Sequence, residues 1–224
     1  MSNRRKAIIA ATAAAVVIAA VIIVLIGHGG TKTHEPQASA SGTGCPSGPQ
    51  SSTIPTAPPS DLQWKGVGAI EVPTSASDGP FRVQGDVQSC FAHSPMGAVI
   101  AAYDIFGSLL SPQGMTAAAL AGLAPGPGRQ VYIAGTHAQG IPTLTPGELV
   151  QPVGFQVVAY TPEQATIETL ASAGGQSYQA DERTLVWSGD DWRLLLTPDG
   201  SIGPDPQLVQ SAAGFVLWGS GSNG

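Results

Sequence analysis

An uninterrupted apolar segment near the N-terminus constrains this chain more than any other feature. It begins at Ala7 and ends at Ile26, and it holds no charged residue, proline or glycine. An α-helix of that length spans about 30 Å, the thickness of a bilayer's hydrocarbon core. Arg4, Arg5 and Lys6 precede it, and positive residues before a single apolar span keep the N-terminus in the cytoplasm. The sequence therefore predicts a single-pass protein of the cell membrane whose C-terminal domain is extracytoplasmic.

A cleaved signal peptide is the alternative interpretation of this segment. Signal peptides have apolar runs of typically about 7–15 residues and a cleavage site of small residues. The run here is longer, and Leu25, Ile26, Gly27 and His28 form a poor cleavage context. The pattern favours an uncleaved signal-anchor with a basic cytoplasmic stub at residues 1–6.

Composition changes sharply after the apolar segment. Residues 27–60 are rich in Gly, Ser, Thr and Pro and show no apolar periodicity, which predicts a flexible linker. Residues 61–218 are numerous enough to form one domain with a hydrophobic core, and residues 219–224 are predicted to fray. From residue 61 onward the chain carries fourteen Asp and Glu residues against five Lys and Arg. This acidic balance argues against nucleic acid and against an anionic membrane surface as partners.

The chain has two cysteines, Cys45 and Cys90. An even number of cysteines in an extracytoplasmic protein favours a disulfide, which would attach the end of the linker to the domain. Two free buried thiols are the alternative. No Cys or His spacing typical of a zinc site accompanies them, so neither a metal nor another cofactor is predicted. His28, His34 and His137 lie in predicted loops without ligand partners at suitable spacing.

Helices are predicted in the first half of the domain. Ser94 is a candidate N-cap, Pro95 suits the first helical position, and apolar residues then recur at three- and four-residue spacing as far as Leu110. The opposite side of this helix is predicted to be polar and solvated, with Gly97, Ala101, Asp104 and Ser108. A second helix is predicted over residues 115–123, whereas residues 129–134 suit either a strand or a third helix, followed by a loop over residues 135–152.

Strands are predicted before and after these helices. Short extended segments are expected at residues 64–72 and 81–83. Four strands at residues 155–160, 165–171, 178–187 and 192–196, joined by turns, predict an antiparallel meander, and the tail at residues 208–218 is expected to dock on the domain. Helices followed by a meander define an α+β domain, with helices packed on a curved four-stranded sheet.

Four stretches carry a resemblance to a known family. CFAHSPMGAVIAAYDIF, GFQVVAY, TLVWSGDDWRLLLTPDG and FVLWG resemble actinobacterial single-pass membrane proteins of unknown function that are often encoded in integrative and conjugative elements. The resemblance covers residues 64–218 and the anchor. It implies an ectodomain similar to the nuclear-transport-factor-two-like cone, a fold also found in scaffold subunits of conjugation and type IV secretion channels. That fold hosts enzymes, binders and scaffolds, so it does not choose among functions.

A catalyst built on such a cone would need ionisable residues inside its pocket. The candidates for a pocket are His93, Tyr103, Asp104 and Tyr160, and for each a structural role is the favoured interpretation. His93 is expected to hold a loop, Asp104 to be solvated and Tyr103 to belong to the core. No catalytic residue is predicted, and no phosphate-binding loop, Gly-x-Ser-x-Gly motif or His-Glu-x-x-His motif occurs.

Two further features of the meander have simple structural interpretations. Asp190 and Asp191 fall in a predicted hairpin loop, where Asp is favoured because its side chain bonds the backbone. Trp187 and Trp192 flank that loop and are expected to face each other across the strands.

Three functional hypotheses remain open. The first is a non-catalytic, membrane-anchored scaffold of a cell-envelope complex, of the conjugation-channel kind, whose partners are other envelope proteins or further copies of itself. The second is an extracytoplasmic binding module with a pocket for a lipid or small apolar ligand between the first helix and the sheet. The third is a surface enzyme that uses His93 or Asp104.

Overall fold

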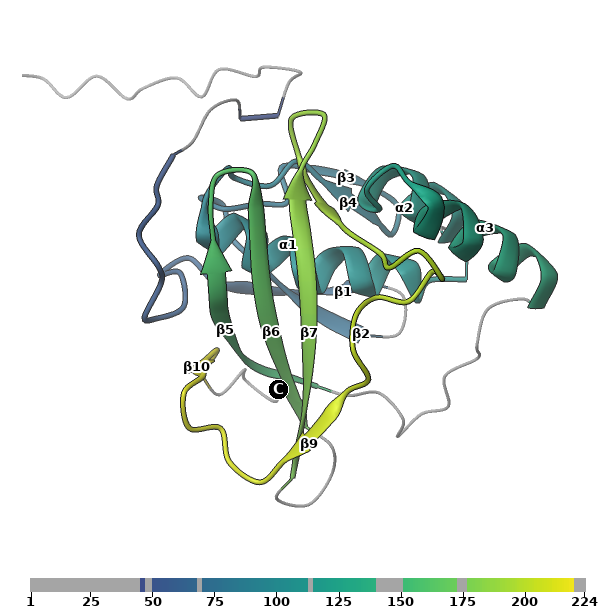
Figure 1. Ribbon diagram of the computed structural model, residues 1–224. Helices are drawn as coiled ribbons and strands as arrows, with labels where there is room; N and C mark the ends of the chain where they lie inside the picture. The colour runs from purple at the N-terminus through teal and green to yellow at the C-terminus, as the bar shows by residue number, and fades with distance from the viewer. Residues whose placement is uncertain are drawn as a thin grey trace, which may run out of the picture. The chain divides into compact units, whose positions relative to one another are not determined.

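A computed structural model of the protein describes residues 45–46, 50–67, 70–112, 115–139, 151–172 and 177–219. The chain forms short strands first, then three helices, then the strands of the main sheet (Figure 1). In order, the elements are β1 (Gln63–Val67), β2 (Ile70–Thr74), β3 (Arg82–Gln84), β4 (Val87–Ser89), α1 (Pro95–Leu109), α2 (Met115–Gly122), α3 (Pro127–Gln139), β5 (Pro152–Tyr160), β6 (Gln164–Ser172), β7 (Tyr178–Trp187), β8 (Trp192–Leu194), β9 (Gln207–Val209) and β10 (Val216–Leu217).

The predicted antiparallel meander is confirmed. β5, β6, β7 and β8 pair in sequence, β10 extends the sheet beside β5, and β9 returns to pair with β7. The turn between β5 and β6 is closed by Thr161 N–H, which donates to the carbonyl of Gln164 at 2.7 Å. Two register irregularities in β5 mark β-bulges, and bulges bend the strand that contains them. The domain is therefore α+β, as the order of helical and strand patterns predicts.

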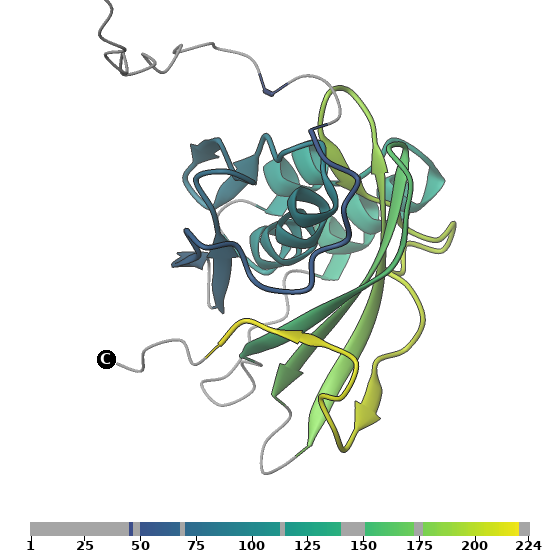
Figure 2. The ribbon, with the colours of Figure 1, turned by 90° about the vertical axis from the view of Figure 1, so that its left-hand side faces the viewer.

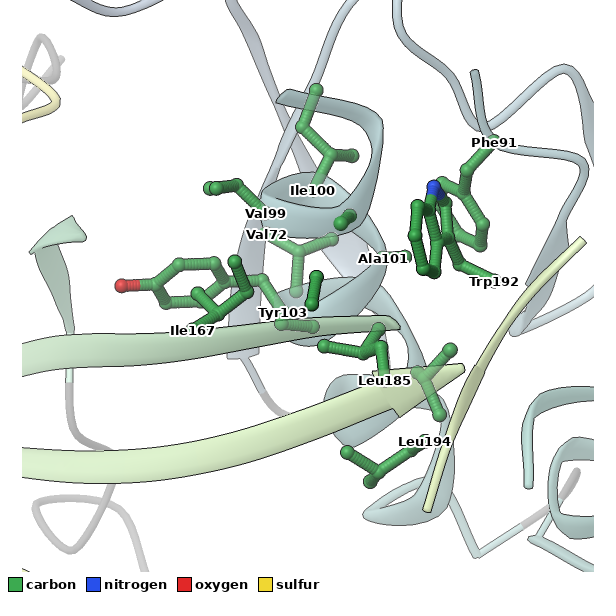
Figure 3. Packing of buried hydrophobic residues seen from close by; sticks show 14 of the residues in the cluster. Val72, Phe91, Val99, Ile100, Ala101, Tyr103, Ile167, Leu185, Trp192 and Leu194 are labelled. Carbon is green, nitrogen blue, oxygen red and sulfur yellow. The ribbon is translucent and has the colours of Figure 1, made fainter. Parts of the chain in front are cut away.

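Helix α1 begins where the sequence predicts. The Ser94 hydroxyl accepts from Gly97 N–H at 3.0 Å, and Pro95 occupies the first helical position, where its missing N–H costs nothing. Figure 2 shows α1 end-on, between the main sheet and the short N-terminal strands. Its sheet-facing side contributes Val99 and Tyr103 to the core, which meet Ile167 of β6 and residues of β7 and β8 (Figure 3).

The prediction that the other side of α1 is solvated is wrong. Asp104 is fully buried and Ser108 is 2 % exposed, because β2 and β4 cover this side of the helix. A Cβ atom on Gly107 would lie only 3.0 Å from Val72 of β2, so glycine at this position lets the strand approach closely. The residues of α1 that lie opposite its apolar stripe thus face a second layer of protein instead of water.

Other boundaries differ modestly from the predictions. The uncertain segment at residues 129–134 belongs to a helix, α3, which continues to Gln139 into the predicted loop; residues 140–150 lie outside the described residues. The extended residues 64–72 form a hairpin of β1 and β2, and the strand predicted to end at residue 196 ends at Leu194. The C-terminal tail docks as predicted, through β9, β10 and the buried ring of Trp218.

The predicted membrane anchor at residues 7–26 lies outside the described residues, so its helix stays a prediction. Within the part of the chain that the structure describes, no helix is both long and apolar enough to cross a membrane. Residues 50–60, assigned to the linker by composition, run beside the domain, and Gln50 N–H donates to the carbonyl of His93 at 3.0 Å.

Candidate functional site

His93 lies in an aromatic cluster at the start of α1. Its ring stacks on Trp187 with centroids 3.8 Å apart and planes 3° from parallel, and it meets the edge of Trp192 at 5.7 Å. One ring nitrogen, Nε2, lies 2.5 Å from the carbonyl oxygen of Pro162, whereas Nδ1 has no partner among the described residues. Tyr160 joins the cluster through Trp192, with ring centroids 5.9 Å apart. His93 therefore joins the segment before α1 to the turn between β5 and β6.

The predicted pair of Trp187 and Trp192 is confirmed at the centre of this cluster. The two residues are directly opposite in the register of β7 and β8, and their rings meet edge to face at 5.4 Å. Trp192 is fully buried, and its indole N–H donates to the carbonyl of Ala92 at 2.9 Å. The pair thus packs in the core and ties the end of the sheet to the residues that precede α1.

Tyr103 is a core residue, as predicted. Its hydroxyl bonds the carbonyl of Gly154 in β5, and it accepts from the N–H of Leu170 in β6 at 3.2 Å. Burial raises the pKa of Tyr103 far above its ordinary value. The neutral phenol therefore connects α1 to two strands of the main sheet.

Asp104 follows Tyr103 but points away from the sheet, since successive helical residues are rotated by about 100°. Its Oδ1 accepts from Gln88 Nε2 of β4 at 3.4 Å, and its Oδ2 has no partner among the described residues. Burial raises the pKa of this carboxyl well above its ordinary value of 3.8, and the distant charge of Lys65 opposes the shift only in part.

Replacing Asp104 with asparagine is expected to change how stability depends on pH. The raised pKa means that folded wild-type protein retains a proton which the unfolded chain has lost, so wild-type stability falls as pH rises from about 3.8 to the folded pKa. The slope from this group approaches about 1.4 kcal/mol for each pH unit in that window. Asparagine does not titrate, so the stability of Asp104→Asn relative to wild type should increase with pH. Urea unfolding at intervals from pH 4 to pH 8 measures this difference, and parallel profiles for the two proteins would contradict the burial of an ionisable group here.

The four pocket candidates thus occupy three different surroundings. His93 and Tyr160 share the Trp192 cluster, Tyr103 faces β5 and β6, and Asp104 faces β4. His93 and Asp104 lie eleven residues apart along one helix and its cap, which corresponds to roughly 16 Å. In the described residues no group of three or more His, Cys, Asp or Glu side chains is placed to hold a metal ion.

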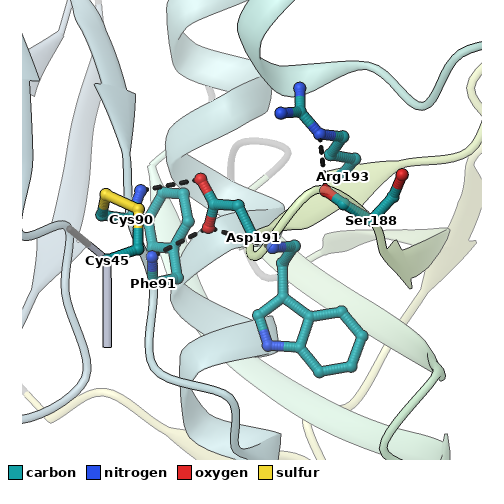
Figure 4. The surroundings of a disulfide bond; sticks show 7 residues. Cys45, Cys90, Phe91, Ser188, Asp191 and Arg193 are labelled. Atoms are coloured by element: carbon teal, nitrogen blue, oxygen red, sulfur yellow. Dashed lines mark hydrogen bonds between the residues drawn. A yellow bond between two sulfur atoms is a disulfide. The ribbon is translucent and has the colours of Figure 1, made fainter. Parts of the chain in front are cut away.

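The predicted disulfide between Cys45 and Cys90 is present, and it closes a loop with a sequence separation of 45 residues (Figure 4). Asp191, from the hairpin between β7 and β8, reaches the same place. Its carboxylate accepts from the N–H groups of Cys90 at 2.7 Å and Phe91 at 2.9 Å, and from Trp192 N–H at 3.0 Å. Asp191 does accept from backbone N–H groups, as its position in a hairpin suggests. Two of these groups, however, lie about a hundred residues away in the sequence and not in the hairpin itself.

A cleft of about 400 Å³ lies between the last turn of α1, β7, α3 and the loop that precedes β9. Apolar side chains from Phe106, Tyr132, Ile202, Pro204 and Pro206 contribute to its walls. Its polar lining includes Gln179, Asp181, Glu182, Arg183 and Asp205. The cleft is therefore an acidic depression with aromatic and proline walls, at a distance in the fold from the His93 cluster.

Arg183 is the most unusual residue of this cleft, because it is a cation with only 4 % of its surface exposed. Its Nη1 donates to the carbonyl of Ala102 at 2.9 Å, and its guanidinium carbon lies 4.1 Å from the ring centre of Phe106. Its Nη2 lies 3.9 Å from Asp181, longer than a charge-assisted hydrogen bond. Burial lowers the pKa of Arg183. The geometry leaves both charges incompletely paired.

The profile of a family described as a domain of unknown function, DUF8175, matches residues 28–217. The chain belongs to this family. The family assignment agrees with the resemblance to an uncharacterised family, while the actinobacterial source, the conjugative elements and the cone-shaped fold stay predictions. No curated protein and no solved structure matches the chain.

Sequence reasoning missed the cleft of this DUF8175 domain, although one signal for Arg183 was present. Arg183 lies two residues before Leu185 and four before Trp187, so strand alternation directs its side chain to the same inner face as these apolar residues. An arginine at an inward position of a strand is a candidate functional residue. The loop that completes the cleft, residues 200–206, offers no periodic pattern from which its path could be predicted.

Proposed function

We propose that this protein is a non-catalytic, membrane-anchored scaffold of a cell-envelope complex. The observation that supports this most directly is the use that the fold makes of its buried ionisable residues. His93 stacks on Trp187, Tyr103 connects α1 to β5 and β6, and Asp191 binds the backbone beside the disulfide. Each makes its contacts with other parts of the fold, and those contacts join separate elements of the domain.

The Cys45–Cys90 disulfide supports an extracytoplasmic location for this scaffold. Disulfides persist in oxidising compartments and are rare in the cytosol. Together with the apolar segment at residues 7–26 and the basic residues before it, the disulfide favours a domain held outside the membrane by its N-terminus. A conjugation-type channel is the complex we propose, on the strength of the motif resemblance and its implied cone-shaped fold.

Co-purification tests the scaffold proposal. The tagged full-length protein, extracted in mild detergent, is expected to bring down other membrane proteins from the same cells. The association should survive His93→Gln combined with Asp104→Asn, because these side chains serve the fold and the substitutions keep their approximate size. A full-length protein that purifies alone, or whose tag at the C-terminus is protected from protease added outside the cell, would contradict the proposal.

The cleft beside Arg183 favours a second candidate function, that of a binding module. The hypothesis of a binding module places a lipid or apolar ligand between α1 and the sheet. Core side chains such as Val99, Ile167 and Leu185 fill that interface (Figure 3). The cleft lies farther along, at the end of α1, and carries charged groups. A bound ligand there would accordingly be polar, and binding and scaffolding become one function if that ligand is part of a partner protein.

A further inference from the structure

The charge of the cleft determines whether it attracts a positively or a negatively charged ligand. Three carboxylates line it, from Asp181, Glu182 and Asp205, against the single guanidinium of Arg183. Glu182 and Asp205 are exposed, so their negative charges stand at the surface. An anionic ligand would meet repulsion from all three carboxylates, whereas a cation would be attracted.

The walls select the shape of that cation. Phe106, Tyr132, Ile202 and two prolines offer apolar and aromatic surface beside the carboxylates. Lys and Arg side chains match such a site, because an apolar stem carries the charged group and the cation interacts favourably with aromatic rings. Asp181 is available to such a cation, since its contacts are long: 3.3 Å to Gln179 Nε2 and 3.9 Å to Arg183 Nη2.

Arg183 adds a separate requirement for an acceptor. This guanidinium lines the cleft, and within the described part of the chain its Nη2 has only the long 3.9 Å contact with Asp181. A donor without a hydrogen bond on a buried cation is costly, so a ligand that brings a neutral acceptor to Nη2 gains affinity. The acidic lining would repel a free carboxylate, whereas a main-chain carbonyl oxygen is an acceptor without negative charge.

We propose that the cleft binds a basic peptide segment of a partner protein. A Lys or Arg side chain of that segment lies between the apolar walls with its charge against Asp181, Glu182 and Asp205, and a main-chain carbonyl of the same segment accepts from the Arg183 guanidinium. This inference rests on the proposed scaffold function and names the surface and the chemistry by which the scaffold holds its partner.

Peptide binding to the full-length protein in an uncharged detergent tests the inference. The probe is a fluorescently labelled octapeptide of alternating lysine and glycine, followed by anisotropy, beside a matched octapeptide with glutamine in place of lysine. The lysine peptide should bind saturably, more weakly as salt is raised, and about tenfold more tightly than the glutamine peptide. No saturable binding, or equal binding of the two peptides, would overturn the proposal.

A pair of charge-matched double variants assigns the binding to the cleft. Glu182→Gln with Asp205→Asn removes two exposed carboxylates from the cleft and should weaken binding about tenfold. Glu71→Gln with Glu163→Gln removes two exposed carboxylates elsewhere and should leave affinity within about twofold of wild type. Equal losses in the two double variants would show a general effect of acidity and overturn the cleft as the site.

Co-purification separates this inference from the proposed function. Loss of membrane partners in the Glu182→Gln, Asp205→Asn variant, with their retention in the Glu71→Gln, Glu163→Gln variant, supports the cleft as the docking site. A cleft variant that keeps every partner overturns this inference but does not contradict the proposed scaffold function. A wild-type protein without partners overturns the scaffold itself.

Discussion

Replacing Asp191 with alanine is expected to destabilise the protein by about 3–5 kcal/mol. The carboxylate is 5 % exposed and accepts from three backbone N–H groups, those of Cys90, Phe91 and Trp192. Alanine leaves these donors without an acceptor in a place that water does not reach, and each unsatisfied buried donor costs about 1–3 kcal/mol. The same change disconnects the hairpin after β7 from the segment that precedes α1.

Urea unfolding followed by tryptophan fluorescence, with the disulfide kept oxidised, measures this loss. Asp191→Asn is the matched control, because its amide oxygen can still accept from Phe91 and Trp192, whereas its NH2 group cannot accept from Cys90. The asparagine variant should therefore lie between wild type and alanine. An alanine variant within about 1 kcal/mol of wild type would show that water or a rearranged loop satisfies these donors.

A single methyl group at Gly97 is expected to cost at least about 3 kcal/mol or to prevent folding. A Cβ atom there would lie 2.0 Å from the carbonyl oxygen of Ala92 and 2.8 Å from its carbon, and both are backbone atoms. That oxygen accepts from Ser94 N–H at 2.8 Å and from the Trp192 indole at 2.9 Å. Moving Ala92 aside would therefore strain or break both bonds.

Gly135→Ala is the control, because it makes the same change from glycine to alanine in a helix where no neighbouring atom lies close. Gly135 is also helical, in α3, and nothing lies within 4 Å of a Cβ built on it. Alanine should stabilise that helix by up to about 1 kcal/mol, since glycine is the poorer helix former. Thermal unfolding of both variants compares the same change in two surroundings. Equal midpoints for Gly97→Ala and wild type would contradict the close packing of Ala92 on α1.

Local sequence signals predicted α1 and the meander because the relevant physics is local. The cap at Ser94 needs only neighbouring residues, and the turn at residues 161–164 closes within its own backbone. Asp104 shows where such reasoning ends. Its helical position predicted solvent exposure, but β2 and β4 cover that side of α1, and no periodicity along one helix reports what packs on its outer side.

The candidate site was harder to predict because it is assembled from distant parts of the chain. Asp191 meets Cys90 across about a hundred residues, and the cleft combines the end of α1 with α3, β7 and the loop before β9. Sequence reasoning found the cysteine pair because residue type and number suffice for that inference. Arg183 was visible only as an inward position in an alternating strand, and its pairing with Phe106 depends on tertiary packing.

The disulfide also fixes the route by which mechanical load enters the domain. A pull on the chain upstream of Cys45 passes through the sulfur atoms to Cys90, at the entrance to α1 and beside Asp191. The 45-residue separation between the cysteines corresponds to roughly 150 Å of extended chain that carries no tension while the bond is intact. The β1–β2 and β3–β4 hairpins therefore remain unloaded, and tension acts first on the junction between α1 and the sheet.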